Sequence, residues 1–164
     1  MPPLITSQRL ALRPHQPSDA AFMVALNSDP LVVKYTGDVA LQDVEEAGPI
    51  IAALQRQFVE RRLGRLVTLH KTSGERLGWC GFKWHDDAQA VDLGFRFFRA
   101  HWNQGYATEA SVACLRWLAE HTDIRRVIAH AMPVNVGSVR VLQKVGFEAV
   151  GGVLHDGFQR FELK

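Results

Sequence analysis

The chain changes its apolar period partway along, and this change limits the folds open to it. Three runs between residues 65 and 98 (RLVTLH, GERLGWCGFKWH and AVDLGFRFF) alternate as strands do and are separated by turn-forming KTSG and HDDAQ, which predicts an antiparallel meander. From residue 106 the pattern becomes helix, strand, helix and two strands, with Asp156-Gly157 as a hairpin signal. This order predicts an α+β fold: a mixed, mostly antiparallel sheet of about six to seven strands with helices on both faces.

The residues before the meander predict one strand and two helical stretches. ITSQRLALRP indicates a strand that ends at Pro14, and Ser18 is expected to cap a short helix after it. Apolar residues recur every three or four positions over 41–63, which predicts a second helix. We expect Gly48 and Pro49 to break or kink that helix.

Length and charge exclude several classes of protein. The 164 residues are the size of one domain, so we expect a single domain over residues 1–164. A net charge of +2 disfavours a nucleic-acid binder with a broad basic field, and no apolar stretch is long enough to cross a membrane. Cys80 and Cys114 lack metal-ligand spacing, so we expect no metal site and a reducing cytoplasm.

The segment HWNQGYATEASVACLRWLAEHT, residues 101–122, passes abruptly from a loop into a helix. A helix that begins near Gly105 presents free N–H groups and a positive dipole end to an anion. Gly105 and the small Ala107 would let a phosphate approach the backbone, and Thr108 could add a hydroxyl donor. The alternative is that the glycine only turns the chain and the alanine only packs.

In this context the chain resembles a known family. FRFFRAHWNQGYATEA resembles the acyl-CoA pyrophosphate motif of the GNAT N-acetyltransferase superfamily. The segments SQRLALRPHQPSDAAFMVALNSDP, RLGWCGF and NVGSVRVLQKVGFEAVG also match in order, most closely in the branch of ribosomal-protein alanine N-acetyltransferases and their relatives. Trp102 departs from the wider superfamily, which has Gln or Arg three residues before the first loop glycine. The resemblance implies acetyl-CoA as co-substrate.

The resemblance also implies which residues hold the acyl-CoA. In the family a pantetheine arm pairs with the strand before the loop, which spans residues 95–98 here, so we expect contacts at Phe95, Phe97 and Phe98. The implied cradle of backbone amides comprises Asn103, Gln104, Gly105, Tyr106, Ala107 and Thr108.

The helix after Asn135 carries the remaining expected contacts. The resemblance implies that Asn135 contacts the acyl-CoA and that Ser138 lies near its thiol, whereas composition alone favours Asn135 as a simple helix N-cap. Arg140 and Lys144 could reach the nucleotide phosphates, and a solvated helix face is the alternative for both.

Acetyl transfer to an amine requires a proton donor for the departing thiolate. Many members of the superfamily use a tyrosine. Tyr35 lies far upstream and Tyr106 lies inside the phosphate loop, so Ser138 is the better candidate here.

Transfer also requires a base that takes the amine proton. Asp92 alternates with apolar neighbours in AVDLGFRFF, so its carboxylate points away from them, and an acidic residue on the matching strand is common in the family. An exposed strand carboxylate without a catalytic role is the alternative. His85 and Glu109 are weaker candidates.

We therefore expect an N-acetyltransferase that transfers acetyl directly to a primary amine, either a protein N-terminus or a small molecule such as a polyamine, amino acid or aminoglycoside. A cationic acceptor could meet four acidic residues that could equally be a solvated helix start: Asp38, Asp43, Glu45 and Glu46. Two rival functions are a non-catalytic acyl-CoA-binding module and a site for another phosphate ligand. A homodimer is compatible with exposed strand edges.

Overall fold

The computed structural model describes residues 3–164 and contains one mixed sheet in the order β1-β2-β3-β4-β5-β6-β8-β7. Its eight strands are β1 (Ile5–Thr6), β2 (Leu10–Arg13), β3 (Arg65–His70), β4 (Arg76–His85), β5 (Ala90–Phe97), β6 (Val127–Ala131), β7 (Phe147–Val150) and β8 (Gln159–Leu163). Neighbouring strands are antiparallel except β5 and β6, which are parallel. The α+β architecture and the meander are confirmed. The strand count is higher than expected because a turn at residues 7–9 divides the first expected strand in two.

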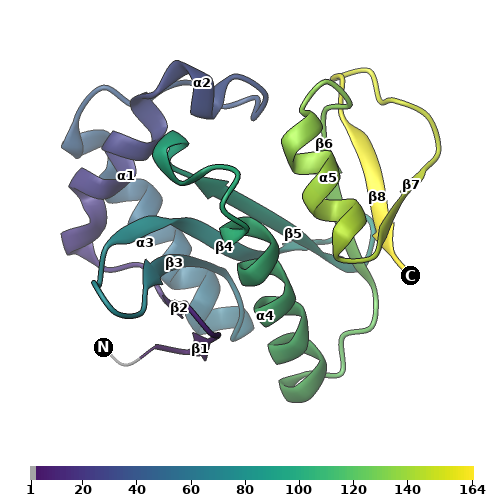
Figure 1. Ribbon diagram of the computed structural model, residues 1–164, viewed down its shortest axis with the longest axis horizontal. Coiled ribbons are helices and arrows are strands. Elements are labelled where there is room, and N and C mark those ends of the chain that lie inside the picture. Colours follow the sequence, from purple (N-terminus) through teal and green to yellow (C-terminus); the bar gives the residue numbers. More distant parts are fainter. Residues whose placement is uncertain (1–2) are drawn as a thin grey trace.

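Helices cover both faces of this sheet, as predicted (Figure 1). They are α1 (Ala20–Ser28), α2 (Pro30–Val33), α3 (Val44–Arg61), α4 (Tyr106–His121) and α5 (Val136–Lys144), with short 3-10 turns at Pro17–Asp19 and Arg99–His101. Figure 1 shows α4 and α5 in the foreground and α3, fainter, behind the sheet. Within residues 3–164 no helix is long and apolar enough to cross a bilayer.

Alternation along the strands assigns each side chain to one of the two faces. Cys80 of β4 faces α4, where its sulfur lies 3.8 Å from that of Cys114. Its neighbour Trp79 packs on the opposite face in the cluster that contains Phe22 and Leu26 of α1. The same rule places Leu93 and Phe97 of β5 toward α4, and Asp92 and Arg96 toward α1 and α3.

One expectation about helix boundaries is wrong, and the break expected at Gly48 and Pro49 is not found. Ser18 lies inside the 3-10 turn, where the Asp19 carboxylate accepts the amide of the N-cap residue Gln16, so Ser18 is not an N-cap. The helix α3 continues through Gly48 and Pro49 without a break. Pro49 lies early in the helix and removes only one backbone donor, and a capping box formed by Asp43 and Glu46 stabilises the helix start.

Candidate active site

The strands β5 and β6 are paired over only a short stretch. Their register joins Val91 to Val127 and Asp92 to Ile128, and beyond these pairs the strands separate. The amide of Val91 points toward β6 and donates to the carbonyl of Arg126, which precedes β6. The amide of Phe98 points the other way and donates to the carbonyl of Leu77 in β4.

By alternation, the backbone groups of Leu93, Phe95 and Phe97 face the same side as those of Val91. Among the described residues no strand pairs with β5 there. This open edge can take an extended ligand as an added strand. It matches the contacts expected at Phe95 and Phe97, whereas the Phe98 ring packs on Phe22 at a centroid distance of 5.8 Å.

The start of α4 presents free backbone donors next to this edge. Gly105 is the N-cap residue and has φ of +80°, and Asn103 has φ of +59°. The carbonyl of Gly105 accepts the amide of Glu109 at 3.0 Å. The amides of the three preceding residues (Tyr106, Ala107 and Thr108) therefore have no intrahelical carbonyl partner. The predicted helix start is confirmed, and its free donors fit a phosphate group.

Glu109 anchors the loop before α4 to the N-terminal strands. Its carboxylate accepts hydrogen bonds from the Ser7 hydroxyl, the Arg9 amide and Arg9 Nε, each at 2.7 Å. Burial opposes ionisation, but these bonds from Ser7 and Arg9 lower the pKa of Glu109. The Arg9 guanidinium also lies 4.4 Å from the centroid of Tyr106 and donates to Gln104 O. Glu109 is thus an ionised structural anchor, which disfavours it as the base.

Trp102, the departure from the superfamily pattern, has a structural role at the same loop. Its indole Nε1 donates to Phe97 O at 2.9 Å, so it ties the loop to the end of β5. The side-chain amide of Gln104 donates to Ala100 O at 2.8 Å in the same turn. The loop is therefore held by side chains, and its backbone amides remain available.

Asp92 forms a hydrogen-bonded pair with a residue that the sequence analysis did not single out. His130 of β6 places Nδ1 at 2.7 Å from Asp92 Oδ2, and the side chains are 19% and 21% exposed, respectively. The ring of His85 stacks on that of His130 at 5.7 Å between centroids. Because Asp92 and Ile128 are the last paired residues of β5 and β6, the pair lies where the strands separate. A carboxylate that accepts from Nδ1–H leaves Nε2 as a proton acceptor.

The three polar side chains of this cluster could also hold a metal ion. Ligand atoms of His85, Asp92 and His130 lie within 4.8 Å of one another. His and Asp are common zinc ligands, and a structural zinc site ordinarily takes four ligands. The 2.7 Å bond between His130 and Asp92 matches a proton-transfer pair instead.

The comparisons with known proteins agree with this geometry. The family model described as an acetyltransferase (GNAT) domain matches residues 9–148. The chain belongs to the GNAT acetyltransferase family. An uncharacterised N-acetyltransferase, p20, from Bacillus licheniformis is 28% identical over 146 residues, which cover 88% of this chain and 82% of that protein. The protein is therefore an acetyltransferase that uses acetyl-CoA as its acetyl donor.

Solved GNAT structures share the fold at low identity. A spermidine N-acetyltransferase from Vibrio cholerae, in complex with CoA and spermine, has a TM-score of 0.81 at 14% identity and 96% coverage of both chains. A putative ribosomal-protein-serine acetyltransferase from the same organism has a TM-score of 0.80 at 22% identity and 99% coverage of both chains. Because the two scores are nearly equal, the fold does not single out the ribosomal-protein branch.

The GNAT helix α5 begins as its composition suggested. Asn135 is its N-cap residue, and its side chain accepts the amide of Ser138 at 3.4 Å. The side chain of Ser138 is half-buried at the first turn, and Leu142 anchors the helix in the core. The cap is confirmed, while the acyl-CoA contacts of Asn135 and Ser138 remain predictions.

Arg140 and Lys144 are both exposed on α5. Among the described residues neither makes an ion pair. Their contact with nucleotide phosphates stays a prediction, and both charges are free for it.

The thiols of this GNAT enzyme lie in its core. Cys80 and Cys114 are fully buried, 3.8 Å apart, and neither forms a disulfide. The hydrogen bond to Cys80 and burial raise the pKa of Cys114 well above its usual value. A buried protonated thiol is a poor nucleophile.

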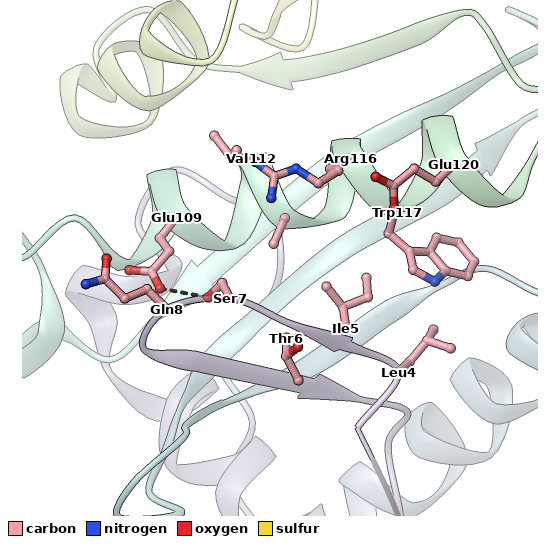
Figure 2. Close-up of a pocket in the computed structure, with 11 residues that line it drawn as sticks. Leu4, Ile5, Thr6, Ser7, Gln8, Glu109, Val112, Arg116, Trp117 and Glu120 are labelled. Atoms are coloured by element: carbon pink, nitrogen blue, oxygen red, sulfur yellow. Dashed lines mark hydrogen bonds between the residues drawn. The ribbon is translucent and has the colours of Figure 1, made fainter.

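A groove of about 490 Å³ lies between α4 and the segment around β1 (Figure 2). Figure 2 shows Trp117 close to Leu4 and Ile5, with the bond from Ser7 to Glu109 at one end. It contains neither member of the Asp92–His130 pair, so we do not assign the chemistry to it.

The four acidic residues expected near a cationic acceptor have separate roles. Asp43 and Glu46 cap α3, which supports the helix-start alternative for them. Glu45 is exposed in the same turn. Asp38 lines a cavity, and its carboxylate pairs with Arg96 at 2.8 Å.

Proposed function

We propose that this enzyme transfers an acetyl group directly from acetyl-CoA to a primary amine, with the Asp92–His130 pair as the base. The observation that carries the proposal is the position of this pair. It lies half-buried where β5 and β6 separate, next to the open edge of β5. The free amides at the start of α4 lie beyond the carboxyl end of the same strand.

The pair takes the proton that the attacking amine must lose. His130 Nδ1–H donates to the Asp92 carboxylate, so Nε2 is the proton acceptor and the carboxylate stabilises the imidazolium that forms. The amine nitrogen bonds to the carbonyl carbon while the bond from that carbon to sulfur breaks. The proton on His130 then passes to solvent.

Ser138 assists the departure of the CoA thiolate. Its hydroxyl, half-buried at the first turn of α5, would donate a hydrogen bond to the departing thiolate as the thiolate takes up a proton. A free thiol has a pKa of about 8.5, so this assistance is modest near neutral pH. The free N-terminal amides of α4 and exposed Arg140 and Lys144 would hold the phosphates meanwhile.

Two observations favour direct transfer over a covalent enzyme intermediate. Both cysteines are inaccessible, and the half-buried Asp92–His130 pair offers a base that an incoming amine could use directly. A non-catalytic acyl-CoA-binding module would have no need of a hydrogen-bonded base at this position.

The test measures acetyl-CoA binding, the acetylated product and the mass of the enzyme. The protein is incubated with acetyl-CoA and a panel of primary amines, and thiol release and acetylated products are measured. We expect an acetylated amine and, with acetyl-CoA alone, an unmodified protein mass. An acetylated protein would contradict direct transfer. Calorimetric binding of acetyl-CoA without turnover of any amine would instead favour the binding module.

A further inference from the structure

A second cavity, of about 300 Å³, lies on the face of the sheet covered by α1 and α3. Its apolar wall comes from the helices and the segment before α3, and its lining also includes Trp79 of β4. The apolar residues are Met23, Val39, Leu41, Ile50 and Leu54. This volume is at the lower end of the range for small-molecule sites, so it suits a compact ligand.

Two guanidinium groups line this cavity from β3 and β5, the strands on either side of β4. Arg65 of β3 lies 4.7 Å, and Arg96 of β5 lies 5.5 Å, from the Trp79 ring centroid. Arg96 donates to Asp38 at 2.8 Å and to Asn27. The guanidinium of Arg65 makes no hydrogen bond or ion pair within the described residues, and its Nε is buried without a partner.

The cavity therefore carries a net positive charge. Burial lowers the pKa of His15 to about 4, so this lining residue is neutral at pH 7. The charged lining is then Arg65, Arg96 and Asp38, and the carboxylate of Asp38 is 61% exposed and screened by water. Burial and the charge of Arg96 lower the pKa of Arg65, as expected for a cation without a carboxylate of its own.

Arg65 also lies close to the proposed reaction centre. Its Nε is 4.0 Å from the position that a Cβ atom on Gly94 would occupy, and the Trp79 ring is 3.2 Å from that position. Gly94 lies on the open part of β5, two residues after Asp92. The missing side chain makes room for the Trp79 ring, and the Arg65 guanidinium lies at ordinary contact distance beside the strand at which transfer would occur.

We propose that the acceptor is a free amino acid with an apolar side chain, whose carboxylate is bound by Arg65. A guanidinium can bind a carboxylate through two parallel hydrogen bonds, and Arg65 has its donors free for them. The apolar wall receives the side chain. A polyamine would bring positive charge to two arginines, and a peptide N-terminus has no carboxylate next to its amine. This inference rests on the proposed acetyl transfer.

The experiment compares acceptors that differ only in the carboxylate. Thiol release from acetyl-CoA is measured with L-leucine, L-methionine and L-phenylalanine, each against its C-terminal amide, and with spermidine. The amide has the more acidic ammonium group, so more of it is neutral near pH 7 and a preference for the free acid runs against this bias. We expect kcat/KM for at least one free acid to exceed that of its amide at least tenfold.

Arg65→Gln should remove that preference. We expect its kcat/KM for the free acid to fall at least tenfold, with little change for the amide and unchanged acetyl-CoA affinity. Arg61→Gln is the matched control, because Arg61 also lies over a tryptophan, Trp84, at 5.3 Å but outside the cavity. If Arg65→Gln does not fold, the wild-type comparison of acid and amide decides alone.

Three results would overturn the inference: a wild-type preference for the amides or spermidine, acetyl-CoA binding without acetylation of any free acid, or equal losses for acid and amide in Arg65→Gln. Failure of the proposed function is a different result. In that case acetyl-CoA would not bind, or no amine of any kind would be acetylated.

Discussion

His130 Nδ1 lies 2.7 Å from Asp92 Oδ2 across the last paired residues of two parallel strands. The two residues are 38 positions apart in sequence, and the pairing of β5 with β6 brings them together. A carboxylate in this position orients the imidazole and favours the tautomer that carries its proton on Nδ1, which leaves Nε2 able to accept a proton.

This relationship predicts a large loss of rate when either member changes. Asp92→Asn and His130→Gln should each lower kcat by roughly 100-fold or more, with the acetyl-CoA affinity unchanged, because each removes the base function. The double variant should be about as slow as the worse single variant, since the two act together. Steady-state kinetics and calorimetry measure both quantities. His121→Gln, on the far end of α4, is the control, and a comparable loss there would point to a general structural effect.

Substitutions of Asn135 and Ser138, at the start of α5, should have different effects: one on stability and the other on rate. Asn135→Ala should lower the free energy of unfolding by about 1 kcal/mol, because it removes the helix cap. Ser138→Ala keeps the cap and should mainly lower kcat, since it removes the hydroxyl near the thiolate. Urea unfolding and initial rates distinguish the two. Unchanged kcat in Ser138→Ala would exclude Ser138 as the proton donor.

Replacing Gly105 should weaken acetyl-CoA binding as well as destabilise the backbone. A Cβ there would meet Arg9 Nη2 at 3.4 Å at a φ of +80°. Gly74 provides the control, because it has a φ of +73° and open space around it. Both alanine variants should lose about 1 kcal/mol of stability. Only Gly105→Ala should also bind acetyl-CoA more weakly in calorimetry. If both variants bind acetyl-CoA with the same affinity, the phosphate is not bound at this loop.

Stability should fall on mild acidification because of His15. Burial, reinforced by the charges of Arg13 and Arg65 and opposed by Asp19, lowers its pKa from 6.5 to about 4. The unfolded chain therefore binds the proton more readily, so the stabilisation is complete above pH 6.5 and is lost between there and about pH 4. We expect a loss of about 1–2 kcal/mol from pH 6.5 to pH 5 in urea unfolding. His15→Gln should flatten this dependence, and an unchanged slope would assign it to other groups.

Chelation should leave the reaction intact. If His85, Asp92 and His130 form a proton-transfer cluster and not a metal site, prolonged dialysis against EDTA should not lower kcat. His85→Gln should then retain most of the activity, unlike changes to its two neighbours. Loss of activity with EDTA, restored by zinc, would identify the cluster as a metal centre.

Local sequence patterns predicted the parts of the site that depend on neighbouring residues. The start of α4 follows from Gly105 and the helical pattern behind it, and the inward alternation of β5 isolates Asp92 on one face. The partners of these residues depend on distant pairing. Nothing near His130 in the sequence points to Asp92, and the turn that divides β1 from β2 is held by Glu109, which bonds to Arg9 100 positions away.

Pairing between distant strands also explains why the sequence did not predict the second cavity. Arg65 and Arg96 lie on strands that are not neighbours in the sheet, and they meet over Trp79 only because β4 lies between them. As single residues in alternating strands they resemble solvent-facing cations. Their shared environment appears only when strand register is known.

The separation of β5 from β6 has a consequence for the protein's lifetime. The unpaired edge leaves backbone groups that an extended acetyl donor would complete, so a donor bound there as proposed would stabilise the folded protein at this point. Resistance to proteases should then rise with the surrounding concentration of acetyl-CoA. In a cell with little acetyl-CoA, the enzyme would be both idle and more rapidly degraded, so its abundance would follow the supply of its own substrate.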